Sequence, residues 1–197
     1  MYARAGSRSC LLTAAKVTLV RGWRGYVSGD VRWALFQVRQ STVVSLANCP
    51  VLPAILRGRA LWGARVRVGP AALVYGGQTV QGRGTLRLGA GSFVNHGCYF
   101  DTVADIEIGD GVFLADHVRV LTSTHEVGAA MRRAGRLVGR PVTIGAGTWV
   151  GSGAVIMPGV RIGSGCIVGA NSLVTKDCDR DGVYVGSPAR RVRSVDG

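Results

Sequence analysis

A six-residue repeat between Val142 and Lys176 constrains the fold of this chain more than any other feature. Aliphatic residues recur there at every sixth position without slippage: Ile144, Val150, Ile156, Ile162, Val168 and Val174. Small or apolar residues follow the first five at a distance of four: Thr148, Ala154, Val160, Cys166 and Ser172. Neither the 3.6-residue period of a helix nor the two-residue period of a strand explains this spacing. It predicts a parallel β-helix in which one side chain per hexapeptide points into a narrow core.

The same pattern extends backwards through the chain with three interruptions. Taking three hexapeptides per coil, the earlier core positions are Val68, Val74, Val80, Leu88, Val94, Phe100, Ile108, Leu114 and Val120. The spacing between successive core positions is six residues, but it lengthens to eight after Val80 and Phe100 and to 24 after Val120. Each interruption follows the third hexapeptide of a coil, so all insertions should leave the solenoid at one corner. The sequence thus predicts about five coils over residues 66–178, with an extruded loop at 126–140.

The segments that flank the repeats are basic. Residues 1–65 are expected to form a basic arm and a helical cap, with an amphipathic helix over Val31–Leu46 and a second helix from Pro53 to near Gly63. Such a cap would cover the open end of the first coil. Residues 179–197 should form a basic tail that packs on the outside of the β-helix. A last strand is expected there at Tyr184–Val185.

Charge is distributed unevenly over the 197 residues, which carry a net charge of +13. Residues 1–67 hold eleven Arg or Lys against the single acid Asp30, which gives +10. A basic arm of this kind suits a polyanionic ligand, an acidic carrier protein or a membrane surface, and it also suits a merely cationic soluble surface. The charge alone does not choose among these partners.

The cysteines and the hydropathy pattern indicate a cytoplasmic protein. The five cysteines are odd in number and form no CxxC motif, which favours reduced thiols. The apolar run near the N-terminus is interrupted by Lys16, so no signal peptide is expected. No segment reaches the roughly 18 uncharged apolar residues of a membrane span.

Stacking the coils places small residues in columns. Asn95, Ala115 and Gly169 share one position of the second face, and Ser152 and Ala170 share the next position. Such a column leaves a smooth channel in which backbone amides and a serine hydroxyl can bind an extended ligand. Small residues also suit tight turns, so this pattern alone leaves both interpretations open.

Four segments together resemble the sugar O-acetyltransferase branch of the hexapeptide-repeat acyltransferases, the galactoside and maltose acetyltransferases. They read GDGVFLADHVRVLTSTHEV, PVTIGAGTWVGSGAVIMPGV, VTKD and GSPARRVR, and the resemblance covers roughly residues 66–195. It implies a left-handed β-helix and a homotrimer that binds acetyl-CoA between its subunits, with no metal. The positions that match the family's cofactor contacts are Ala115, Ser152, Ala170, Thr175, Lys176, Arg190 and Arg193.

Three residues are implied in catalysis. His125 matches the catalytic histidine of the family, and a base with a pKa near neutrality suits removal of the acceptor proton, an effect worth about 10²–10⁴-fold in rate. Asn95 matches an active-site asparagine that can orient the acceptor or the carbonyl. Asp101 lies slightly before the family's active-site acid, so it is expected to bind the acceptor, to orient His125 or only to cap a turn.

The acceptor is the least constrained part of the prediction. The acid that the sugar enzymes carry near the N-terminus has no match, because Asp30 is not a convincing substitute, and Glu126 also departs from the galactoside pattern. A sugar, a polysaccharide precursor or a glycosylated natural product is expected, with an amine acceptor or a donor bound to a carrier protein as alternatives. Trp149 is expected to line the site or a subunit interface.

Two further interpretations of the whole chain remain open. One is a non-catalytic scaffold, and the other is a zinc enzyme resembling γ-carbonic anhydrases, whose three histidines would have to be His96, His117 and His125.

Overall fold

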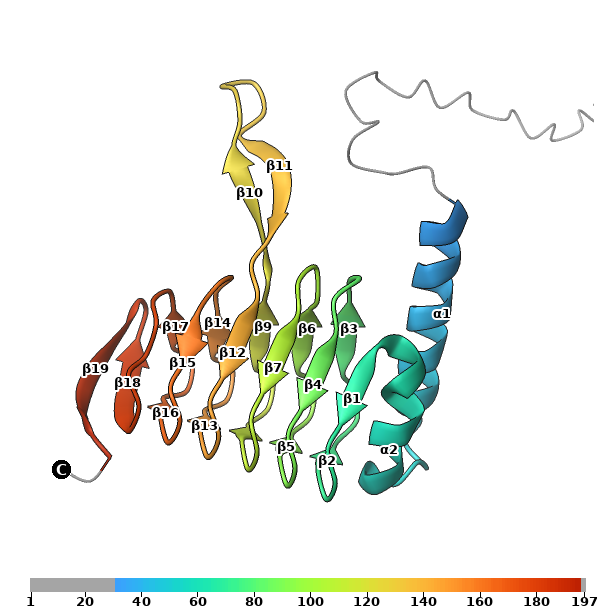
Figure 1. The fold of residues 1–197 in the computed structure, drawn as a ribbon, viewed down its shortest axis with the longest axis horizontal. Coiled ribbons are helices and arrows are strands. Elements are labelled where there is room, and N and C mark those ends of the chain that lie inside the picture. The colour runs from blue at the N-terminus through green and yellow to red at the C-terminus, as the bar shows by residue number, and fades with distance from the viewer. Residues whose placement is uncertain (1–30, 196–197) are drawn as a thin grey trace, which may run out of the picture.

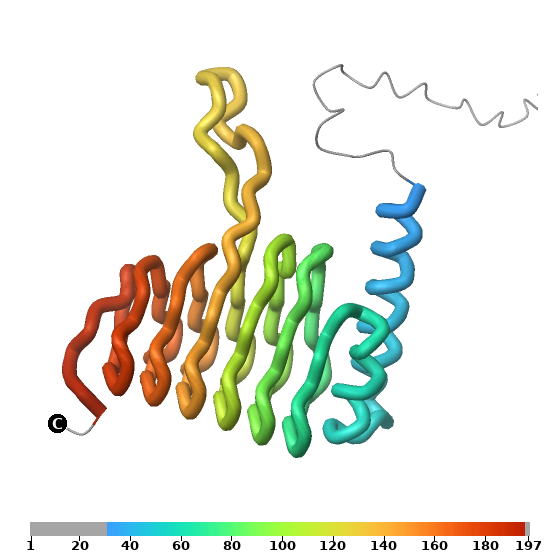
Figure 2. Tube along the Cα trace, in the orientation of Figure 1, coloured from blue at the N-terminus to red at the C-terminus, as the bar shows by residue number. Residues whose placement is uncertain are grey.

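The computed structural model describes residues 31–195. Within this range the chain winds into a solenoid, with helices at its N-terminal end and a hairpin that projects from its side (Figure 1; Figure 2). The predictions for the first 30 residues, including the basic arm, lie outside the described residues.

Each coil contributes one short strand to each of three sheets, named A, B and C here. Sheet A contains β1 (Val66–Val68), β4 (Leu86–Leu88), β7 (Ile106–Ile108), β12 (Val142–Ile144) and β15 (Arg161–Ile162). Sheet B contains β2 (Leu73–Val74), β5 (Phe93–Val94), β8 (Phe113–Leu114), β13 (Trp149–Val150), β16 (Ile167–Val168), β18 (Gly182–Gly186) and β19 (Ala189–Ser194). Sheet C contains β3 (Thr79–Gln81), β6 (Tyr99–Asp101), β9 (Arg119–Leu121), β14 (Val155–Ile156) and β17 (Leu173–Val174).

Strand pairing places the predicted core residues in columns along the solenoid axis. Ile156, for example, pairs with Val120 on one side and Val174 on the other. All fifteen predicted core positions are buried except Val68, which is half-buried beneath the second helix. Burying an aliphatic side chain of this size contributes roughly 1.5–3 kcal/mol, so the column is the main source of stability. The predicted parallel β-helix of five coils is confirmed, and an isolated bridge at Cys178 together with β18 adds part of a sixth coil.

The turns differ from corner to corner. Corner B–C denotes the turns that lead from a strand of sheet B to the next strand of sheet C, and corner C–A those that lead from sheet C to sheet A. The turns at corner B–C are tight, and each uses one residue with positive φ: Gly77, Gly97, His117, Gly153 and Asn171. Every insertion in the repeat leaves at corner C–A, as the spacing predicts.

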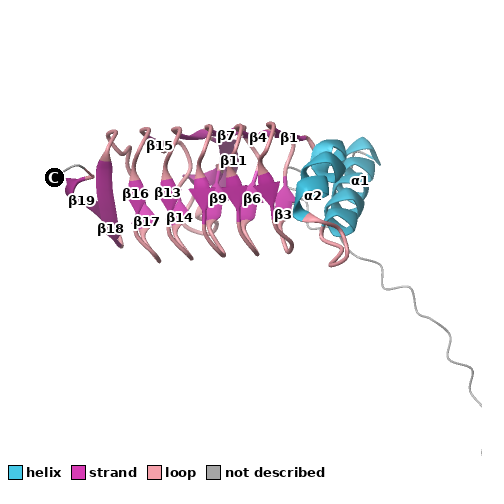
Figure 3. Ribbon diagram, turned by 90° about the horizontal axis from the view of Figure 1, so that it is seen from below, coloured by secondary structure: helices cyan, strands magenta, loops and turns pink. Residues whose placement is uncertain are grey.

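The N-terminal helices cover the first coil (Figure 3). They are α1 (Val31–Ala47) and α2 (Ala54–Ala60), followed by the 3₁₀ turn η1 (Leu61–Ala64). Two amide side chains, one in α1 and one directly after it, bond to the exposed edge of this coil: Gln40 Nε2 donates to Gly82 O at 3.1 Å, and Asn48 Nδ2 donates to Gln78 O at 2.8 Å. These bonds satisfy backbone groups that the end of a solenoid leaves unpaired. The predicted N-terminal helical segment is therefore present.

The predicted loop at 126–140 is an antiparallel hairpin and begins earlier than expected. Its strands are β10 (Ser123–Val127) and β11 (Ala134–Gly139), and Arg140 N closes its base by donating to Thr122 O at 2.7 Å. The hairpin and α1 extend to the same side of the solenoid (Figure 1). The extruded segment has regular strand pairing, with β-branched Thr124 opposite Val138, and no hexapeptide spacing reveals this pairing.

The C-terminal segment folds back antiparallel on the last coil. β18 contains the predicted strand Tyr184–Val185, and β19 pairs with it along its outer edge. Tyr184 is buried, and its hydroxyl accepts a hydrogen bond from Asp179 N at 2.7 Å. The tail thus covers the edge that β16 would otherwise expose.

Candidate active site

Asp101, at the end of β6, holds the base of the hairpin. Its Oδ2 accepts hydrogen bonds from Ser123 N at 2.9 Å and from the Ser123 hydroxyl, and its Oδ1 accepts one from Val103 N at 3.3 Å. The residue is only 8% exposed. Both carboxylate oxygens are therefore engaged within the chain, and Oδ2 holds Ser123, which lies two residues before His125.

His125 lies on β10, facing the opposite strand of the hairpin. Its Nδ1 is 3.0 Å from Gly135 O on β11. A carbonyl oxygen only accepts, so this contact requires the proton on Nδ1 and leaves Nε2 as the basic nitrogen of the neutral ring. The side chain is half-buried. The hairpin thus fixes both the orientation and the tautomer of the imidazole.

A pocket of about 520 Å³ opens beside His125 and Asp101. Its floor is sheet C, one wall is the hairpin, and the other wall comes from α1 and the loop after β3. The side chains that define these surfaces are Tyr99, Arg119 and Leu121, then Ser123, His125 and Leu137, then Trp33 and Arg83. The pocket therefore joins segments that are more than one hundred residues apart in the sequence, Trp33 and Leu137.

Aromatic rings hold the two arginines of this pocket. The guanidinium of Arg83 lies 4.3 Å from the ring centroid of Trp33, and that of Arg119 lies 5.9 Å from the centroid of Tyr99. Trp33 is in turn stacked on Phe36, with centroids 5.5 Å apart. Burial raises the pKa of Tyr99, with a further contribution from the charge of Asp101, so the phenol stays protonated near neutrality.

Four of the predicted site residues lie at corner B–C. Asn95, Ala115, Ser152 and Ala170 follow successive strands of sheet B, as the column analysis predicts. Ser152 and Ala170 are exposed, and the Oδ1 of Asn95 accepts a hydrogen bond from His96 N at 2.9 Å. Nδ2 of Asn95 has no hydrogen-bond partner within residues 31–195. Of these four residues, three present small side chains at this corner and Asn95 presents an amide donor.

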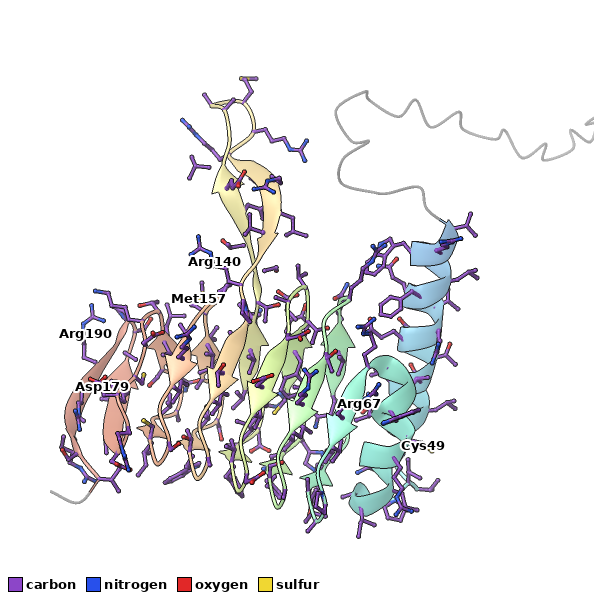
Figure 4. All side chains as sticks on the ribbon, viewed as in Figure 1. Cys49, Arg67, Arg140, Met157, Asp179 and Arg190 are labelled. Atoms are coloured by element: carbon purple, nitrogen blue, oxygen red, sulfur yellow. The ribbon has the colours of Figure 1, made fainter. Side chains whose placement is uncertain are left out.

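The other predicted cofactor residues lie at the C-terminal end. Lys176 and Arg190 line one recess of about 210 Å³, with Thr175 next to Lys176 in the chain. Arg190 and Asp179 mark this end of the solenoid in Figure 4. Arg193 lies further along β19, where its Nη1 donates to Ser194 O at 3.0 Å.

The predicted residues therefore form two groups rather than one. Asp101, His125 and Lys176 lie at corner C–A, whereas Asn95 and Ser152 lie at corner B–C, on the opposite edge of sheet C. Within one chain the structure brings Asp101 to His125 and Lys176 to Arg190. It does not bring Asn95 to the pocket at His125.

The remaining histidines and Trp149 lie away from this pocket. His96 and His117 are neighbours at corner B–C, where His117 N donates to His96 O at 2.9 Å, and His125 is at the other corner. Among residues 31–195, no three His, Cys, Asp or Glu side chains gather as a metal site would require. Trp149 is 51% exposed on the outer face of sheet B, where it pairs with Phe113.

Sequence reasoning missed several residues of the pocket. Ser123, Arg83, Arg119 and Tyr99 face outward from the repeat, where the hexapeptide period places no constraint on residue type. One signal was available: Tyr99 and Arg119 are one coil apart in the same column, so the repeat alignment makes them neighbours. Nothing in the sequence indicates that Trp33 of α1 joins them.

Comparisons with known proteins agree with this fold. The family model for bacterial transferase hexapeptide repeats (six repeats) matches residues 141–176. Nodulation protein L of Rhizobium meliloti (strain 1021) is 39% identical over 123 residues, which are 62% of this chain and 67% of that protein. The crystal structure of a maltose O-acetyltransferase from Clostridium difficile 630 has a TM-score of 0.72 and 31% identity, covering 86% of this chain and 91% of that one. The chain belongs to the hexapeptide-repeat acyltransferases.

Membership of this family confirms the predicted left-handed β-helix and the resemblance to sugar acetyltransferases. A hexapeptide-repeat acetyltransferase from Vibrio cholerae O1 biovar eltor, solved in complex with acetyl-CoA, is 26% identical with a TM-score of 0.75 and covers 85% of this chain and 91% of that chain. The chain spans about half the length of the curated relatives it matches, such as 50% of one from Schizosaccharomyces pombe. Neither described α-helix of this acyltransferase is long and apolar enough to cross a bilayer.

Proposed function

We propose that this protein transfers an acetyl group from acetyl-CoA to a hydroxyl of a sugar or glycoside. The observation that carries the proposal is the geometry of His125, whose ring is oriented by Gly135 O beside a pocket large enough for a sugar. The family relatives that are named as maltose and galactoside O-acetyltransferases support the reaction class.

His125 acts as the general base in this proposal. Nε2 takes the proton of the acceptor hydroxyl as its oxygen attacks the acyl carbonyl. The bond from Nδ1–H to Gly135 O then stabilises the positive charge that the ring acquires. The same proton can afterwards pass from Nε2 to the departing thiolate. Asp101 is a positioning residue, because its two oxygens hold Ser123 and Val103 rather than facing the acceptor.

Acetyl-CoA supplies the activated acyl group. The side chains at corner B–C and at the C-terminal end of the solenoid have the chemistry to bind it. Ala115, Ser152 and Ala170 present small side chains along corner B–C, which suit the uncharged pantetheine arm. Lys176 and Arg190 share a recess whose cations suit phosphate groups. Thr175 and Arg193 are the remaining residues that we expect to contact acetyl-CoA.

The proposed active site is formed between copies in a homotrimer. His125 and Asn95 lie on opposite edges of sheet C, so one chain cannot bring both to a single acceptor. A second copy that sets its corner B–C against the pocket of the first would supply Asn95, whose Nδ2 can donate to the developing oxyanion. We place the reaction in the cytoplasm, a proposal supported by the four free cysteines of the described region.

The test is acceptor-dependent release of free thiol from acetyl-CoA, measured with a panel of sugars, glycosides and amines. His125→Ala should lower kcat by about 10²–10⁴-fold. Met131→Ala, at a hairpin position that is 99% exposed, is the matched control and should keep wild-type activity. Release that persists undiminished in His125→Ala would contradict the assigned base, and failure to bind acetyl-CoA would contradict the reaction class.

A further inference from the structure

Two arginines in the pocket of His125 lack acidic partners. Within residues 31–195, neither Arg83 nor Arg119 has a carboxylate within 4.0 Å, and each is held only by its aromatic neighbour. Other arginines of the chain do form ion pairs, such as Arg136 with Glu126 and Arg180 with Asp181. Two cations are therefore presented to whatever fills the pocket.

The aromatic contacts hold these cations in place before a ligand arrives. The Trp33 ring is engaged by two neighbours, since it stacks on Phe36 with centroids 5.5 Å apart and has the Arg83 guanidinium 4.3 Å from its centroid. The guanidinium keeps its N–H edges available when it lies over a ring face, and these edges match the oxygens of phosphate or carboxylate. This arrangement favours binding of an anion over stacking of a neutral ring on Trp33.

The one acid that lines the pocket does not neutralise the arginines. Asp101 is 8% exposed, and its oxygens accept bonds from Ser123 and Val103 at the hairpin base. The lining carries two arginines against this single carboxylate, a formal charge of +1 with His125 neutral. The excess charge faces the same space as the proposed base.

We propose that Arg83 and Arg119 select an acceptor that carries an anionic group, a phosphate or a carboxylate, on or next to the sugar that is acetylated. This inference rests on the proposed acyl transfer, of which it names the substrate class. Arg119 precedes His125 by six residues, which limits their Cα separation to about 20 Å, a span that a phosphorylated mono- or disaccharide can bridge. Arg83 and Arg119 are not needed for acetyl-CoA, because Lys176 and Arg190 line a separate recess that suits its phosphates.

The test compares direct binding of glucose 6-phosphate, glucuronate and glucose to the full-length protein, followed by calorimetric titration. The anionic sugars should bind at least about tenfold more tightly than glucose, since a charge-assisted bond of this kind is worth about a tenfold to a hundredfold change. Arg83→Gln and Arg119→Gln should each remove most of this preference. The better of the two anionic sugars identifies the group that is recognised.

Three controls separate this inference from the proposed reaction. Arg161→Gln, an exposed arginine of sheet A outside the pocket, should bind the anionic sugars like the wild type. His125→Ala should also bind them, so loss of acetyl transfer and loss of anion binding are read independently. Equal binding of glucose and its charged counterparts would overturn the inference. So would arginine variants that raise only the KM for acetyl-CoA, which would assign these cations to the donor.

Discussion

The two corners that border sheet C follow the same strands but differ in what the chain does there. At corner B–C every turn is tight, and its amides continue the stacking of the coils, as when Gly153 N donates to Asp116 O at 2.8 Å. At corner C–A the chain leaves the repeat three times and forms the hairpin that carries His125. The first corner repeats one geometry, whereas the second holds Arg83, Asp101 and His125 of the pocket.

This difference separates stability from chemistry. A regular turn keeps its flanking strands in register with the core columns, so these turns form the scaffold. An insertion leaves the core columns in register and can place a histidine where the scaffold has room for it. Substitutions should therefore fall into two classes. Those in the core columns lower the free energy of unfolding, and those in the pocket lower kcat.

The largest stability effect is expected in the core column. Ile156 is fully buried and pairs on both sides, so Ile156→Ala should lower the free energy of unfolding by about 2–5 kcal/mol. Thermal or urea denaturation measures this loss. Leu137→Ala on the hairpin is the matched control, because that side chain is 46% exposed and should change stability little. Equal losses of unfolding free energy in both variants would contradict the assignment of stability to the core columns.

Asp101→Ala should act on activity more than on the fold. It removes the acceptor of Ser123 N, so the hairpin base shifts and kcat should fall by roughly 10²-fold. The KM for acetyl-CoA should stay within about twofold if the residue acts only through His125. Asp101→Asn keeps one carbonyl oxygen and should recover part of kcat. No loss of kcat in either variant would contradict the positioning role.

Gly135→Ala should produce a smaller loss at the same site. A methyl group there would lie 2.7 Å from Glu126 O, so β11 must move and carry the carbonyl that orients His125. We expect kcat to fall by about tenfold with an unchanged melting temperature. The neighbouring change Ala134→Ser, at an exposed position of the same strand, should leave kcat at the wild-type value. A lower melting temperature with normal kcat would contradict this account.

The smallest effect is expected from the ion pair on the hairpin. A hydrogen bond from Arg136 lowers the pKa of Glu126 below its usual value of 4.5, so its contribution to stability is present above that pH and is lost as pH falls through the lowered pKa. Glu126→Gln should melt slightly below the wild type at pH 7 and together with it in strong acid. A difference in melting temperature that grows as the pH falls would contradict the stabilising role of this ion pair.

Much of the fold follows from the sequence, whereas little of the pocket does. The six-residue period specifies which side chains point inward, so the columns and the position of Asn95 were predictable. Outward positions such as Arg119 obey no period, and the contact of Asp101 with Ser123 depends on the path of an insertion. Trp33 reaches the pocket only because α1 packs on the first coil, a tertiary contact that no local pattern encodes.

The most direct test of the account mixes two inactive variants, His125→Ala and Asn95→Ala, by denaturing and refolding them together. If each site combines corner C–A of one copy with corner B–C of the next, random assembly of a trimer should restore about a quarter of the wild-type activity. The variants refolded separately should stay inactive. A mixture no more active than its separate components would show that both residues act within one chain, and it would contradict the proposed site between copies.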